Sequence, residues 1–130
     1  MPNLRVLSVG QCSFDHGNLA AALRRTFQAE TVGVDTAEAA FGLLKQEAFA
    51  CTLVNRLLDA NGESGLEFIR RLRAAPELRS HPVMLVSNYP EAQQQAIALG
   101  AAPGFGKNDL GSAAMAAALR PFLAPAGVSA

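Results

Sequence analysis

The chain has 130 residues, half of them hydrophobic, with eleven basic and eleven acidic side chains. This length suits one domain with a sizeable core, and the apolar content excludes an intrinsically disordered chain. The balanced charge gives no electrostatic basis for binding nucleic acid or an anionic membrane, and no apolar stretch is long enough to cross a bilayer.

The two cysteines, Cys12 and Cys51, are too few for a disulfide framework. The chain enters a strand-like segment directly after Met-Pro-Asn, so we expect no leader peptide. These features predict a protein of the reducing cytoplasm.

Strand-like and helix-like patterns alternate through the first half of the chain. Short apolar or β-branched runs predict strands, and apolar residues spaced by four, such as Leu19, Leu23 and Phe27, predict helices. The expected elements are a strand at residues 4–9, a loop at 10–16, a helix to about 27, a strand at 31–34, a helix at 37–47 and a strand at 49–54.

The second half repeats the alternation. A long loop at residues 55–64 contains the turn signal Asn61-Gly62, and Pro76 and Gly100 mark the ends of helices. The expected elements are a helix from about 65 to 75, a strand at 83–86, a helix at 90–99, a weak strand at 104–106, a helix at 112–123 and a frayed tail or linker at 124–130.

Five strands that alternate with five helices predict one α/β domain at residues 1–123, with a parallel sheet and helices on both faces. In such sheets, ligands and chemistry lie beyond the carboxyl ends of the strands. Asn55 ends the buried run Phe49-Ala50-Cys51-Thr52-Leu53-Val54, so its side chain is expected at this edge.

Four segments in order resemble a known family. They are Gly65-Leu66-Glu67, His81 to Ser87 (HPVMLVS), Ala98-Leu99-Gly100-Ala101 and Gly104-Phe105-Gly106-Lys107. Over residues 4–123 the chain resembles a response-regulator receiver domain of the chemotaxis-regulator type. The resemblance implies a doubly wound, flavodoxin-like sheet of five parallel strands in the order 2-1-3-4-5.

The chain departs from the family at its acidic residues. Receivers hold Mg²⁺ with a neighbouring acidic pair, and here those positions are Gly10 and Gln11, while the phospho-acceptor position is Asn55. Magnesium needs hard anionic oxygen ligands, and an amide is a poor nucleophile toward a phosphoryl group. The loop after Asn55 is also about two residues longer than usual, and Asn108 replaces the usual proline. We therefore expect no metal, no cofactor and no enzymatic activity.

Ser87 and Lys107 match the residues that contact the phosphoryl group in receivers. Without local carboxylates, Lys107 is expected to lie near Asn55 and backbone carbonyls with no charge to neutralise it. One interpretation is an anion or small-ligand site made by Lys107, Ser87 and Asn55. The other is a pocket held shut by neutral hydrogen bonds, in which the Asn55 amide bridges Lys107 and the loop backbone.

Other polar residues of the edge leave alternatives open. Asp59 or Asp15 could accept a phosphoryl group, although acidic residues in such loops are more often simply solvated. Cys12, in the first loop, is a candidate redox thiol, whereas Cys51 is expected in the core and not paired with it.

Phe105 aligns with the aromatic residue that switches position in receivers, and residues 90–123 correspond to their output surface. The last helix carries Ala113, Ala114, Ala116, Ala117 and Ala118, whose small side chains suit a protein partner or a homodimer. The sequence thus predicts a phosphorylation-independent pseudo-receiver that acts as a protein interaction module in bacterial signalling. The alternatives are a conventional receiver that uses Asp59 or Asp15, and a small-ligand or redox protein of flavodoxin-like fold.

Overall fold

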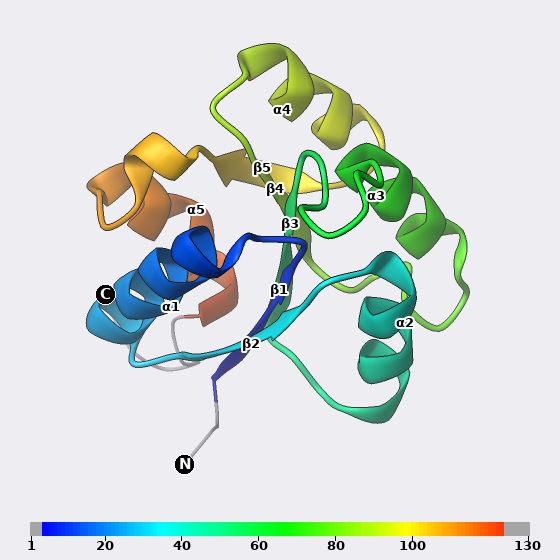
Figure 1. The fold of residues 1–130 in the computed structure, drawn as a ribbon, viewed down its shortest axis with the longest axis horizontal. Coiled ribbons are helices and arrows are strands. Elements are labelled where there is room, and N and C mark those ends of the chain that lie inside the picture. The colour runs from blue at the N-terminus through cyan, green and yellow to red at the C-terminus, as the bar shows by residue number, and fades with distance from the viewer. Residues whose placement is uncertain (1–3, 124–130) are drawn as a thin grey trace.

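The computed structural model describes residues 4–123, so the expectations for residues 1–3 and for the tail at 124–130 lie outside the described residues. Strands and helices alternate as predicted (Figure 1). The elements are β1 (Arg5–Val9), α1 (Ser13–Phe27), β2 (Glu30–Val34), α2 (Ala37–Gln46), β3 (Cys51–Asn55), α3 (Gly65–Ala74), β4 (Val83–Val86), α4 (Pro90–Ala98), β5 (Ala102–Phe105), the short 3₁₀ turn η1 (Lys107–Asp109) and α5 (Ala113–Leu123).

The five strands form one parallel sheet in the order β2-β1-β3-β4-β5, which confirms the predicted topology. The strand β4 is buried along its whole length, as are the first four residues of β3, because helices cover both faces of the sheet. This burial explains why these strands read as continuous apolar runs in the sequence.

Two apolar clusters lie on opposite faces of the sheet. Leu7, Val9, Val54 and Leu85 pack against α2, α3 and α4 on one face, whereas Val6, Leu53, Met84 and Val86 pack against α1 and α5 on the other. Figure 1 shows α1 and α5 on one side of the strands and α2 and α3 on the other. No helix within residues 4–123 is long and apolar enough to span a bilayer.

The helix α1 begins at Ser13, so the prediction of a loop through His16 was wrong. Cys12 is the capping residue, and its Sγ accepts a hydrogen bond from the backbone N–H of Asp15 at 3.4 Å. Cysteine is not among the residues that usually cap helices, so the residue type at position 12 did not indicate a helix start. The four-residue difference brings Asp15 into the first turn of the helix.

The strand β5 is irregular. Met84 pairs with Ala102 and Val86 pairs with Phe105, so β5 contributes one more residue than β4 between the two pairs. A bulge of this kind reverses the alternation of side chains. As a result Ala102 and Phe105 share the α1 and α5 face, and Phe105 is buried among that cluster.

The hydrogen bond between Thr52 Oγ1 and His81 Nε2, 2.7 Å long, joins the middle of the sheet to the segment before β4. Burial, aided by the positive charge of Arg73, lowers the pKa of His81 from 6.5 to about 4. The unfolded chain therefore binds one more proton than the folded chain between these two pH values.

We predict that the contribution of His81 to the free energy of unfolding is constant above pH 6.5, falls as the pH is lowered toward 4, and levels off below it. Because His81 is partly exposed, we expect a loss on the order of 1–2 kcal/mol from this residue. Urea titrations at several pH values would measure it. A His81→Gln variant should lose this component of the pH dependence, and an unchanged pH profile in the variant would refute the assignment.

Candidate functional site

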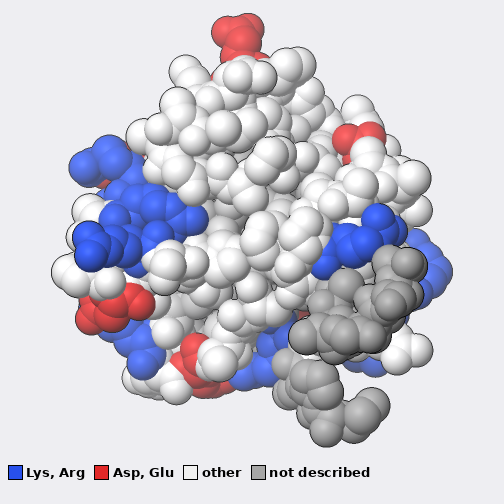
Figure 2. All heavy atoms as spheres, turned by 180° about the vertical axis from the view of Figure 1, so that it is seen from behind, with Lys and Arg blue, Asp and Glu red and all other residues white. Residues whose placement is uncertain are grey.

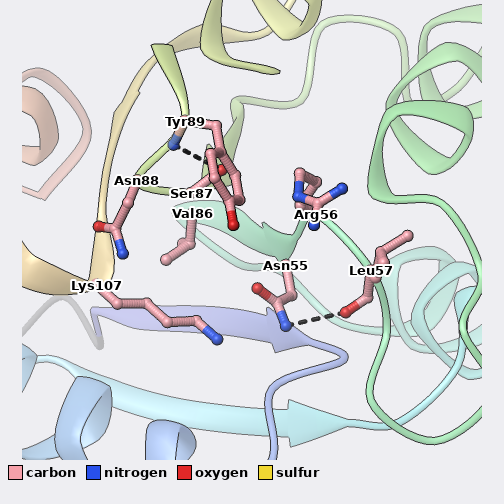
Figure 3. Close-up of a pocket in the computed structure, with 8 residues that line it drawn as sticks. All are labelled: Asn55, Arg56, Leu57, Val86, Ser87, Asn88, Tyr89 and Lys107. Atoms are coloured by element: carbon pink, nitrogen blue, oxygen red, sulfur yellow. Dashed lines mark hydrogen bonds between the residues drawn. The ribbon is translucent and has the colours of Figure 1, made fainter. Parts of the chain in front are cut away.

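The carboxyl edge of the sheet brings together Asn55, at the end of β3, Ser87, just after β4, and Lys107, just after β5. They line a pocket of about 270 Å³ (Figure 3). The other residues that line it are Arg56, Leu57, Val86, Asn88 and Tyr89. The sequence placed these three residues at one edge, and the structure gathers them in one pocket.

The Asn55 side chain is held by backbone carbonyl groups. Its Nδ2 donates a hydrogen bond to the carbonyl oxygen of Leu57 at 2.9 Å and a longer one to that of Gly10 at 3.5 Å. The amide N–H groups thus face two oxygen atoms that would repel a carboxylate in the same position. The expected contact with the loop backbone is present, but Asn55 does not bridge to Lys107.

Lys107 has an acidic partner, so the expectation that nothing would neutralise it was wrong. Its Nζ lies 2.6 Å from Oδ2 of Asp15, which projects from the first turn of α1. Both side chains are mostly buried, with 33% and 24% of their surfaces exposed. The hydrogen bond from Lys107 lowers the pKa of Asp15 more than burial raises it. Asp15 therefore stays ionised at neutral pH, and its carboxylate is the partner of Lys107.

The hydroxyl group of Ser87 also has a hydrogen-bond partner within the chain. Ser87 is buried, and its Oγ accepts a hydrogen bond from the backbone N–H of Tyr89 at 3.1 Å, which closes a tight turn at the start of the loop. The neighbouring Asn88 accepts one from the N–H of Asn108 through Oδ1 at 3.1 Å. These two bonds fix both loops that border the pocket.

The rim of the pocket is aromatic and basic. The guanidinium carbon of Arg56 lies 4.9 Å from the centre of the Tyr89 ring, a cation–π contact. The Tyr89 side chain is 60% exposed and Leu57 is 47% exposed, so both face solvent at this edge. No acidic side chain is among the described residues that line the pocket.

Leu58 fills the space next to Gly10. A Cβ atom at Gly10 would lie 2.4 Å from Cγ of Leu58 and 2.8 Å from its Cα, and Gly10 has a positive φ of 78°. Leu58 is 1% exposed and belongs to the cluster that packs on α2 and α3. The acidic-pair position at Gly10 thus has no room for any side chain.

Gln11 points elsewhere. It is 8% exposed and lines a separate hollow of about 290 Å³ beneath the start of α1, together with Ser8, Ser13, His16, Gly33, Val34 and Asp35. Its Nε2 has no hydrogen-bond partner among the described residues. The position therefore supplies no polar group to the pocket at Asn55.

The remaining candidates lie around this site. Asp59 is exposed and does not line the pocket, although its backbone N–H donates to the carbonyl of Gly10 at 2.9 Å. Cys12 and Cys51 are free thiols, as expected, and burial raises the pKa of Cys51 to about 12. Phe105 is 4% exposed and packs on the α1 and α5 side. Its role as a switch aromatic stays a prediction.

Sequence reasoning missed Leu58 and the pairing of Asp15 with Lys107. An acid in the first turn of a helix is favoured there, but the signal requires a correct helix start. Leu57-Leu58 is an apolar pair within an otherwise polar loop, and that pair was the available sign that the loop folds back into the core.

Comparison with solved structures identifies the fold. A putative response regulator from Chloroflexus aurantiacus J-10-fl aligns with a TM-score of 0.81 and 17% identity, covering 95% of this chain and 100% of its own. The signal receiver domain of a histidine kinase from Syntrophus aciditrophicus gives 0.75 and 20%, covering 97% and 94%. The chemotaxis response regulator CheY4 of Vibrio cholerae gives 0.65 and 17%, covering 81% and 85%.

No protein-family model and no curated protein sequence matches the chain. The structural neighbours are response-regulator receiver domains, and the chain has their fold. The resemblance read from the sequence is therefore confirmed for the fold.

We predict that Gly10→Ala destabilises the protein by roughly 2–4 kcal/mol, because the methyl group adds overlap with Leu58 to the cost of a positive φ. Gly62→Ala is a matched control, since Gly62 has a φ of 74° and open space around its Cβ position. It should lose about 1 kcal/mol, the cost of the backbone conformation alone. Equal losses for the two variants in urea titrations would contradict the packing argument.

Proposed function

We propose that the chain is a phosphorylation-independent pseudo-receiver, which acts in bacterial signal transduction as a protein interaction module and not as an enzyme. The observation that carries the proposal is the packing of Leu58 against Gly10. A side chain that fills the acidic-pair position leaves no place for a metal-binding carboxylate there. The site is therefore rebuilt around different contacts, and a single lost acid does not account for it.

The ion pair of Asp15 and Lys107 supports the same reading. In a receiver the lysine is expected to meet the phosphoryl group, whereas here its charge is already matched within the chain at 2.6 Å. An anion that entered the pocket would have to break this pair or bind beside it. This favours a pocket closed by internal contacts over the anion or small-ligand site.

The alternative of a conventional receiver, phosphorylated at Asp15 or Asp59, is disfavoured by the surroundings of both residues. Asp15 is bound to Lys107, so its carboxylate would have to leave this ion pair before it could attack a phosphoryl donor. Asp59 is exposed outside the lining of the pocket, away from Ser87 and Lys107. For the redox alternative, the second thiol, Cys51, is buried in β3 and is not paired with Cys12.

The proposed partner surface is the face formed by α4, β5 and α5. There are no Lys, Arg, Asp or Glu residues at 92–106 or at 110–119 of the sequence. Seen from behind in Figure 2, a broad uncharged area occupies the centre of the molecule below an acidic side chain at the top, with basic side chains at its two sides. Exposed small residues such as Ala114 and Ala117 allow close approach of another protein or a second copy.

We predict that neither the wild-type protein nor an Asn55→Asp variant gains about 80 Da, the mass of an added HPO₃ group, when it is incubated with a small phosphoryl donor and Mg²⁺. The variant restores a carboxylate but leaves Leu58 in place of the metal ligand. Intact mass spectrometry is the measurement, with a typical receiver domain as the positive control. An adduct on the wild-type protein would refute the proposal.

We also predict that Ala117→Arg reduces capture of a native partner, or self-association, by at least about tenfold, because a bulky charge at the centre of a flat apolar contact is costly. Ala39→Arg makes the same change on the exposed side of α2 and should have no effect. Pull-down from the native host and sedimentation velocity would distinguish a partner from a homodimer. Loss of binding with Ala39→Arg but not with Ala117→Arg would show that the interface does not lie on this face.

A further inference from the structure

Gln93, on the inner side of α4, makes an unusual set of contacts with the sheet. Its Nε2 lies 2.9 Å from the carbonyl oxygen of Leu85, 3.1 Å from that of Ser87 and 3.4 Å from that of Phe105. Its Oε1 accepts a hydrogen bond from the N–H of Gly104 at 3.2 Å. One amide group thus joins α4 to β4, to the loop after β4 and to β5.

The bulge in β5 explains why these backbone groups need Gln93. The extra residue between the pairs Met84–Ala102 and Val86–Phe105 interrupts the ladder of hydrogen bonds between the two strands. Buried backbone N–H and C=O groups require partners. The Gln93 amide offers both a donor and an acceptor, so it replaces the missing strand contacts at Leu85 and Gly104.

The fit depends on Gly104. A Cβ atom there would lie 2.2 Å from the carbonyl oxygen of Leu85 and 3.0 Å from Oε1 of Gln93. No side chain can therefore stand between β5 and α4 at this point. A shift of α4 along the sheet would break the contacts of Gln93 with the Gly104 N–H and the Leu85 carbonyl, which are partly buried.

We propose that Gln93 is a clasp that holds α4 and β5 in a single arrangement, so that the face they form does not respond to the state of the pocket at Lys107. Its regulatory meaning rests on the proposed function, which requires a surface that is always presented. The clasp itself is a property of the fold and is tested without any partner. If the exchange experiment refutes the clasp, the proposed interaction surface is still tested by the binding experiments above. If those binding experiments refute the surface, the clasp is still tested by exchange.

The test is hydrogen–deuterium exchange of the wild type, Gln93→Met and Gln94→Met. Methionine keeps the length of the side chain but has no amide, and Gln94 is an exposed neighbour on the same helix. With Gln93→Met, we expect exchange at residues 85–89 and 102–106 to quicken by about tenfold, with smaller changes in β1 and β3. Gln94→Met should match the wild type.

Equal exchange in the two variants would overturn the clasp, and so would a uniform increase over all five strands, which would indicate a loss of general stability. A second measurement needs no variant. The Gly104 N–H donates to Gln93 Oε1, so NMR of the wild type should show slow exchange of this amide. Rapid exchange at Gly104 would refute the proposal even if Gln93→Met did not fold.

Discussion

The packing of Leu58 against Gly10 is the contact on which the carboxyl edge depends. It draws the loop after β3 into the core, and the loop then returns two hydrogen bonds to the end of β1, from the Asp59 N–H and the Asn55 amide to the Gly10 carbonyl. Buried apolar area and satisfied backbone groups therefore stabilise the same arrangement.

The polar groups around the pocket follow one pattern, in which each is satisfied within the chain. Asn55 binds carbonyl groups, Lys107 binds Asp15, and Ser87 binds the next turn. A partly buried ion pair costs free energy when its partners leave water, and breaking it would leave an uncompensated charge. The pocket is consequently an internally neutral structure with a basic and aromatic rim formed by Arg56 and Tyr89.

Much of the fold could be predicted from the sequence, because apolar runs and regularly spaced apolar residues indicate directly which residues are buried. The strand β4 and the helix α3 were found in this way, and five parallel strands then implied the edge at which Asn55, Ser87 and Lys107 meet. The errors had local physical causes. Cysteine is an uncommon helix cap, which hid the start of α1 and with it the role of Asp15. A bulge has no sequence period, so the orientation of Phe105 and the contacts of Gln93 could not be deduced from alternation.

The filled space at Gly10 has a consequence for the evolution of this chain. Under the proposed function, a gain of metal-dependent phosphotransfer would need an acid at Gly10, a smaller or displaced Leu58 and a carboxylate at Asn55. An acid at Gly10 overlaps Leu58, and a carboxylate at Asn55 faces two carbonyl oxygens, so each change made alone lowers stability. Selection acts on single substitutions, and proteins stay just above a stability threshold. Under the proposed function, the packing of the core therefore makes metal-dependent phosphotransfer costly to acquire by single substitutions.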